Sequence, residues 1–354
     1  MSDMQSRKIV FGITFFILIL FSMTASARVE LTDFFSDFAT SDVTIHSDAN
    51  FNGKAVFELF YSGQLVESHE VPVNIHSGEA LTKVIIWQEK PQHDFYTAIV
   101  SLYEGDRFLS NISYTIAYGT ATLPAFQVVD FSPSNSGVQL LLRSYNPTVT
   151  DIKIELLDNN DLIYSKTKKD ISLTTSTELN IGWPFLLTDN KNYVVRAKIY
   201  SHRLNAPDLI NTYIGTFTAT DDVEILPADI QVDEYGASVT IRGKSQAPFD
   251  GSIIVTARNR LTGDTRSYRQ QLDDILTSGK ESTSGIVWKE IAPGTYDIMI
   301  EAVNQKNISI DTYETVLRIP EYSTSAAITP AKSTPGFEGI AFLILLLLIP
   351  RKGV

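Results

Sequence analysis

The chain has no cysteine among its 354 residues, which excludes disulfide bonds, thiolate zinc sites, iron–sulfur clusters and a cysteine nucleophile. Basic residues are few: 29 Lys and Arg stand against 41 Asp and Glu, a formal charge of −12. The negative electrostatic potential of such a chain repels phosphate backbones, so we expect no nucleic-acid partner. Hydrophobic residues at 44% and charged residues at 20% are ordinary for a globular protein. A disordered chain and a polytopic membrane protein are therefore excluded.

Motifs of catalysis are also missing. No Gly-x-Ser-x-Gly elbow, Walker loop or dinucleotide fingerprint occurs. The acidic pairs at 221–222 and 273–274 are adjacent rather than facing, unlike a glycosidase pair, although calcium at the first pair is an alternative. The run at 158–161 is interpreted as a hairpin turn rather than a calcium loop. The five histidines are His46, His69, His76, His93 and His202, and no two of them have the spacing of metal ligands. We therefore predict no enzyme activity, cofactor or metal.

The first 27 residues have the pattern of a secretory signal peptide. Arg7 and Lys8 precede thirteen mostly apolar residues, 9–21, which are too few to span a bilayer of roughly 30 Å. Ala25 and Ala27 form the small-residue pattern that a signal peptidase cleaves, and we predict cleavage after Ala27. An uncleaved N-terminal anchor is the alternative.

The C-terminal segment combines a stalk with a short apolar run. Residues 321–334 are rich in Ser, Thr, Ala and Pro, a composition that cannot form a core. Pro335, Gly336 and Phe337 follow, then an apolar run at 340–349 and two basic residues at 351–352. A helix of ten residues reaches only about 15 Å, half of the hydrocarbon core, and is a poor permanent anchor.

These three parts resemble the PGF-CTERM sorting signal of archaeal surface proteins, whose usual opening is Pro-Gly-Phe-Glu. The resemblance covers the last twenty or so residues. It implies an archaeosortase that cleaves near Pro335, Gly336 and Phe337 and transfers the protein to a membrane lipid. The protein would then be held on the outer face of the cytoplasmic membrane, as in a glycolipid-anchored protein. The alternative is a short, tilted retention helix that is never processed.

A repeat of about one domain length occupies the rest of the chain. Trp87, Trp183 and Trp288 each end a similar three-residue motif that begins with Ile, and they lie 96 and 105 residues apart. A tyrosine opens an alternating run eight to ten residues after each one: Tyr96, Tyr193 and Tyr296. We interpret these aromatic residues as core and corner residues. The spacing predicts tandem modules at 28–119, 120–221 and 222–320 rather than a solenoid.

Each module has the pattern of an all-β fold. Runs of four to seven residues alternate between apolar and polar, and turn residues such as Ser62-Gly63 separate them. About seven strands per hundred residues predict an immunoglobulin-like or fibronectin-like antiparallel β-sandwich, with helices only in the signal peptide and the C-terminal tail. The order of the runs also resembles the CARDB-type adhesion modules of archaeal and bacterial surfaces.

Surface features differ between the modules. Sequons at Asn111 and Asn307 follow the Tyr-led runs of the first and third modules, and we predict glycosylation at the same hairpin in both. The first module has 5 basic and 13 acidic residues and is predicted to be an acidic tip. Four arginines surround the predicted turn at 262–264: Arg258, Arg260, Arg266 and Arg269. We interpret this segment as a solvated hairpin rather than as a patch that contacts lipid headgroups or anionic sugar.

These patterns together predict a non-enzymatic, lipid-anchored archaeal cell-surface protein with a structural or adhesive role. Its partners would be the archaeosortase, a membrane lipid and a surface protein or polysaccharide. The alternative is a surface lipoprotein that binds carbohydrate or a divalent metal through the first module. A row of exposed aromatic side chains would favour this alternative; the candidates are Phe51, Phe57, Phe60, Tyr61 and Phe95.

Overall fold

The computed structural model describes residues 29–89, 95–117, 119, 122–289 and 291–321. The predicted signal peptide with Ala25 and Ala27, and the predicted sorting signal with Pro335, Gly336 and Phe337, lie outside the described residues. Within the described ranges, no helix is long and apolar enough to span a membrane. Strands dominate the described chain and form several antiparallel sheets, which confirms the all-β sandwich prediction.

The first module packs a three-stranded arrangement against a four-stranded sheet. Strand β3 (Phe51–Tyr61) alternates between buried Ala55, Phe57 and Leu59 and side chains that are only partly buried, so one face of its sheet packs in the core. The turn after it takes Ser62 and Gly63 to φ of +48° and +79°, as a tight hairpin requires. One arrangement has the order β1 (Val29–Ser36), β2 (Thr40–Ser47), β5 (Ala80–Ile86). The other has the order β4 (Gln64–Ile75), β3 (Phe51–Tyr61), β6 (Phe95–Glu104), β7 (Arg107–Ala117).

The second module repeats this arrangement. Its hairpin turn at Asn159 and Asn160, predicted from the sequence, joins β10 to β11, and Asn159 has a positive φ of 56°. Three strands have the order β12 (Ser176–Gly182), β9 (Gly137–Ser144), β8 (Phe126–Pro133). The opposite strands have the order β11 (Asp161–Leu173), β10 (Thr148–Asp158), β13 (Lys191–Ser201), β14 (Leu209–Ala219).

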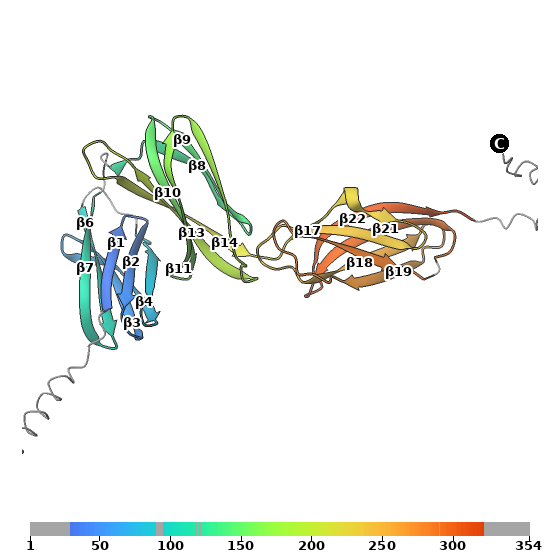
Figure 1. Cartoon of the computed structure of the whole chain (residues 1–354), viewed down its shortest axis with the longest axis horizontal. Helices are drawn as coiled ribbons and strands as arrows, with labels where there is room; N and C mark the ends of the chain where they lie inside the picture. The colour runs from blue at the N-terminus through green and yellow to red at the C-terminus, as the bar shows by residue number, and fades with distance from the viewer. Residues whose placement is uncertain (1–28, 90–94, 118, 120–121, 290, 322–354) are drawn as a thin grey trace, which may run out of the picture.

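The third module again has two packed sheets, and Figure 1 shows it extending away from the other two. In one sheet, β17 (Gly236–Gly243) pairs with β15 (Val223–Ile225), β16 (Gln231–Val232) and β20 (Glu281–Val287). The other has the order β19 (Thr265–Gln271), β18 (Gly251–Asn259), β21 (Gly294–Asn304), β22 (Ser309–Ile319). A short 3-10 helix, η2 (Pro227–Asp229), links β15 to β16.

Buried apolar residues fall into three clusters, each between two layers. The repeated tryptophans are 2–5% exposed and the repeated tyrosines 4–8% exposed. Each indole Nε1 donates a hydrogen bond: Trp87 to Ser36 Oγ at 3.2 Å, Trp183 to Ser134 O at 2.9 Å and Trp288 to Asp233 O at 3.1 Å. The repeated tryptophan is thus a core residue whose polar atom is satisfied.

The first two modules are joined directly, because strands of both belong to one sheet. Its order is β1-β2-β5-β11-β10-β13-β14. The contact pairs Lys83 with Asp161, and Val84 N donates to Asn160 O at 2.8 Å. The Asn160 side chain returns a hydrogen bond from Nδ2 to Val84 O at 2.9 Å. The edge strands of the two modules therefore meet at one residue pair, where β5 and β11 are joined by backbone and side-chain hydrogen bonds.

Candidate functional site

A cluster of buried charges fills the joint between the first two modules. Its centre is the guanidinium of Arg196 on β13, which is 0% exposed. Arg196 Nη1 donates to Asp42 Oδ2 of β2 at 2.7 Å and to Thr40 Oγ1 at 3.2 Å. Arg196 Nε donates to Glu155 Oε2 of β10 at 2.6 Å. One arginine therefore ties a strand of the first module to two strands of the second.

Lys198 and Lys153 complete this network, Lys153 through an ion pair of 2.7 Å with Glu155 Oε1, while Lys83 forms a separate ion pair at the same joint. Lys198 Nζ donates to both oxygens of Asp42, at 2.9 and 3.2 Å, and lies 4.0 Å from the ring centroid of Phe35. Lys83, only 4% exposed, forms an ion pair with Asp161 across the β5–β11 contact. Charges on β2 of the first module and on β10 and β13 of the second thus face each other in a space without bulk solvent, where each needs a partner.

Burial and pairing act in opposite directions on these groups. Burial alone would raise the pKa of Glu155, but Arg196 and Lys153 outweigh it and the pKa is lowered. Burial would likewise lower the pKa of Arg196, yet Asp42 and Glu155 raise it overall. For Lys198 burial prevails over Asp42, and its pKa is lowered. The carboxylate of Glu155 and the guanidinium of Arg196 therefore stay ionised together.

Hydrogen bonds accepted by the carboxylate of Asp37 extend the same joint. Asp37, in the β1–β2 turn, accepts from the backbone N of Ala39 and Thr40 through Oδ1, at 2.9 and 2.8 Å. Its Oδ2 accepts from Thr212 N and Oγ1 of β14, at 3.1 and 2.6 Å. Asp37 and Asp42 both count among the acids of the predicted acidic tip. Part of that negative charge is thus used against the second module rather than presented to a partner.

The second and third modules meet through backbone contacts instead. Gln246 N donates to Asn135 O at 3.0 Å, Leu187 N donates to Gln246 O at 3.0 Å, and Lys306 forms a 3.0 Å ion pair with Asp189. Ala247 lies in the range predicted for the third module but packs in the second core. Among the described residues, the one ion pair of this contact, Lys306–Asp189, is partly exposed, unlike the buried ion pairs of the first joint.

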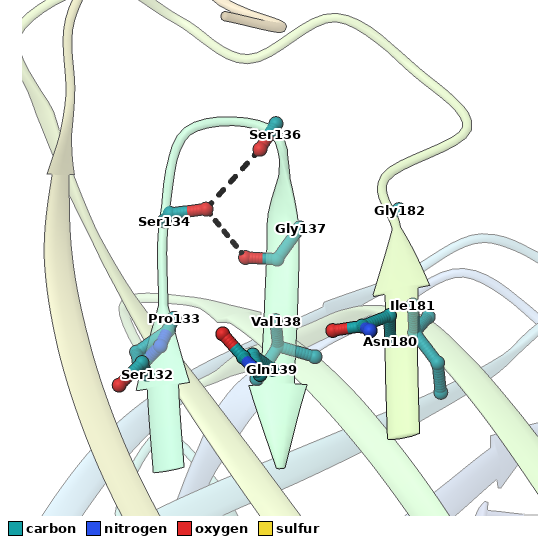
Figure 2. Close-up of a pocket in the computed structure, with 10 residues that line it drawn as sticks. All are labelled: Ser132, Pro133, Ser134, Ser136, Gly137, Val138, Gln139, Asn180, Ile181 and Gly182. Atoms are coloured by element: carbon teal, nitrogen blue, oxygen red, sulfur yellow. Dashed lines mark hydrogen bonds between the residues drawn. The ribbon is translucent and has the colours of Figure 1, made fainter. Parts of the chain in front are cut away.

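An open polar pocket of about 370 Å³ lies beside this second contact. Figure 2 shows the β8–β9 turn, where Ser134 Oγ contacts Ser136 Oγ at 3.3 Å and donates to Gly137 O at 3.0 Å. The lining contributes hydroxyl, amide and backbone groups and no carboxylate or imidazole; it consists of Ser132, Pro133, Ser134, Ser136, Gly137, Val138, Gln139, Asn180, Ile181 and Gly182. Such a pocket can accept hydrogen bonds but holds no group for proton transfer near neutral pH.

His202 is not the isolated surface histidine that the sequence suggests. Its Nδ1 lies 3.1 Å from Asp208 Oδ2 and its Nε2 lies 3.3 Å from Asp151 Oδ1. Donor atoms of Asp151, Asp170 and His202 lie within 4.8 Å of one another, so the set could hold a metal ion. Hydrogen bonds to Asp208 and then Asp151 raise the pKa of His202. A protonated ring bridging two carboxylates accounts for the geometry; its stabilisation is complete below about pH 6.5 and lost as pH rises through the raised pKa.

The other three histidines within the described ranges lie in the first module. His69 Nε2 lies 2.5 Å from Glu67 Oε1, and its ring meets that of Trp87 edge-on at 5.7 Å. His46 lies 3.8 Å from Asp48, and His76 is exposed beside the shallow pocket at the start of β3. His93 lies outside the described residues. Among the histidines that the structure describes, none shares a site with another.

The aromatic candidates of the first module do not form an exposed row. Phe51 and Phe57 are 5% and 0% exposed and belong to the first core. Tyr61 packs on Tyr96 with ring centroids 5.1 Å apart, which leaves Phe95 as the most exposed of the set at 69%. The surface needed for stacking a flat ligand across the five residues is therefore not assembled.

The predicted common placement of the two sequons is wrong, whereas the predicted solvated hairpin at 262–264 is present as the β18–β19 turn. Asn111 lies within strand β7, opposite Ser101, whereas Asn307 lies in the β21–β22 turn, so the two sequons do not share a position. Both side chains belong to exposed residues, and glycosylation stays a prediction. The four arginines do not form one patch: Arg260 pairs with Asp297, while Arg269 Nη1 donates to Asn307 at 2.7 Å near the other end of the module.

Neither a protein-family model nor a curated protein sequence matches the chain. Among solved structures, the chain is similar to the native conformation of E. coli alpha-2-macroglobulin, at 10% identity and a TM-score of 0.22. The alignment covers 84% of this chain and 22% of that one. This likeness is too low to carry a functional argument.

Proposed function

We propose that the protein is a non-enzymatic structural or adhesive component of an archaeal cell surface. It is secreted through its signal peptide and held by a lipid after an archaeosortase removes its tail. The N-terminal and C-terminal segments of the sequence support the location. The all-β sandwich fold supports the role only as an architecture typical of surface proteins, and it sets no partner by itself.

The observation that carries the structural role is the joint between the first two modules. A flexible linker would let the modules move independently, whereas a shared sheet and buried ion pairs fix one against the other. A fixed pair presents its loops and free strand edges at constant geometry, which is what an adhesive or architectural element requires. The ligand-binding alternative gains no support, because Phe51 and Phe57 are core residues.

Replacement of Pro335, Gly336 and Phe337 by alanine tests the proposal in an archaeon that has an archaeosortase. The wild-type protein is expected to lose peptide 340–354 and to partition into detergent as a lipidated species. The triple variant is expected to retain that peptide, because the transpeptidase recognises the motif. Alanine at Ser323, Thr324 and Ser325 of the stalk is the matched control and should be processed normally. Identical processing of all three chains would contradict the sorting role.

A further inference from the structure

The end of the third module from which the chain leaves carries unusually exposed apolar side chains. Four large apolar or aromatic residues of the described chain are more than 70% exposed: Leu204, Leu261, Val287 and Tyr235, at 96%, 93%, 80% and 71%. Three of these four lie in the third module. Scattered exposed apolar residues are normal on a protein surface, but a concentration at one end indicates a contact.

Backbone pairing places two of the three side by side. Trp288 N donates to Tyr235 O at 3.1 Å, and Gly236 pairs with Val287 in the β17–β20 ladder. Tyr235 and Val287 therefore lie on neighbouring chain segments at the end of this sheet.

The β18–β19 hairpin places Leu261 at the same end. Arg260 N donates to Thr295 O at 3.0 Å, and Thr295 pairs with Arg318 near the last residues of β22. Arg266 Nη1 of β19 reaches Lys289 O, which follows β20, at 3.4 Å. Figure 1 shows β22 leaving the module at the end that faces away from the second module. We call the surface formed by Tyr235, Leu261 and Val287 the exit face.

Local hydrogen bonds hold the exit-face turns outward. Asn259 Oδ1 accepts from Leu261 N at 2.8 Å and from Thr262 N at 3.1 Å. Asp233 Oδ1 accepts from Tyr235 N at 2.8 Å and from Gly236 N at 3.0 Å. Turns that are ordered in advance lose little conformational entropy when their side chains are buried by a partner.

We propose that the exit face inserts Leu261, Val287 and Tyr235 into the headgroup region of the membrane that carries the protein. The proposal rests on the proposed anchoring, since residues 321–334 connect this end to the apolar C-terminal tail. A Ser/Thr-rich linker of fourteen residues typically has a root-mean-square span of about 20 Å, which would keep the exit face close to the bilayer. Apolar tips with a tyrosine suit the interface between headgroups and acyl chains.

Burial of apolar side chains, rather than charge attraction, drives this contact. The most prominent arginine at the tip, Arg260, is already paired with Asp297 at 2.6 Å. Asp264 and Asp233 lie in the same turns and offset other cations there. The partner is accordingly a lipid surface of any headgroup charge, and moderate salt should leave the contact intact.

The absence of native cysteine permits a clean test by single-cysteine labelling. The mature protein, purified with its anchor from the membranes of the archaeal host, is reconstituted into phosphatidylcholine vesicles that contain a nitroxide-labelled lipid. An environment-sensitive fluorophore is attached to Leu261→Cys, to Val287→Cys, or to the control Leu204→Cys, which is equally exposed but lies in the second module. Labels at 261 and 287 are expected to shift to the blue and to be quenched several-fold more than the label at 204.

Flotation of the vesicles separates this proposal from the anchoring on which it rests. A protein that floats with the vesicles while all three labels behave as in water would overturn the exit-face contact and leave anchoring intact. A protein that does not float would contradict both. Quenching at 204 equal to that at 261 and 287 would show nonspecific adsorption and would also overturn the proposal.

Discussion

Replacement of Arg196 by methionine is expected to lower the free energy of unfolding of the joined first two modules by about 3–5 kcal/mol. The substitution keeps an apolar stem in the space but removes the guanidinium shared by Asp42 and Glu155, so that each buried carboxylate keeps only one lysine partner, Lys198 and Lys153 respectively. Glu155 is 0% exposed and Asp42 6% exposed, so water cannot replace the lost guanidinium without opening the joint. The measurement is urea unfolding followed by tryptophan fluorescence, with Trp288 as an internal reporter of the third core.

Arg242→Met is the matched control for this prediction. Arg242 pairs with Glu224 and Glu281 at 3.2 and 2.7 Å, but its side chain is 43% exposed. An exposed ion pair contributes about 0–1 kcal/mol, so the control should change unfolding little. Adding Glu155→Gln to Arg196→Met should recover part of the loss, because the fully buried carboxylate that has lost its guanidinium is then neutral, while Asp42 is kept as the partner of Lys198. A loss for Arg196→Met no larger than the control would contradict a buried network.

Replacement of Trp183 by alanine is expected to destabilise the second module by about 3–5 kcal/mol. The indole is 2% exposed and stacks on Phe217 with an interplanar angle of 5°. Alanine would leave a cavity among these rings and would orphan Ser134 O, the acceptor of the indole Nε1. Thermal and urea unfolding of the second module measure the change.

Val287→Ala serves as the surface control for the tryptophan variant. Its side chain is 80% exposed, so its truncation should alter stability by no more than about 0.5 kcal/mol. Trp183→Phe should fall between the two, because it keeps an aromatic ring but loses the hydrogen bond. A Trp183→Ala variant as stable as the surface control would show that the repeated tryptophan is not part of the core.

Local physical chemistry made much of the fold predictable. Alternation in β3 and β13 reports a buried face, and the turns at Ser62-Gly63 and Asn159-Asn160 need residues that tolerate positive φ. These signals depend on neighbouring residues alone. The strands and the sandwich class could therefore be predicted from the sequence without any knowledge of tertiary contacts.

The joint could not be predicted in this way. Alternation places Asp42 and Arg196 on outer faces, where charged residues normally meet solvent. Only the packing of β2 in the first module against β10 and β13 in the second turns those positions into a buried network, and 154 residues separate the two partners. The sequence did hold a weak signal, since the first module is acidic where the second offers Arg196 and Lys198.

The mismatch of the two sequons has a similar cause. Asn111 lies fifteen residues after Tyr96, whereas Asn307 lies eleven residues after Tyr296. That difference of four positions moves one asparagine from a turn into an edge strand. The spacing of the repeated tyrosines does not reveal such an offset, but the offset changes which residues pair in the hairpin.

The intact mass of the native protein from archaeal membranes, with mapping of its C-terminal peptide, tests the central claim most directly. The proposed function predicts a chain that begins at Arg28, ends near Pro335 and carries a lipid. A chain that retains residues 340–354 would contradict lipid anchoring by an archaeosortase. The protein would then be held by its own tail, and the resemblance at Pro335, Gly336 and Phe337 would not reflect sorting.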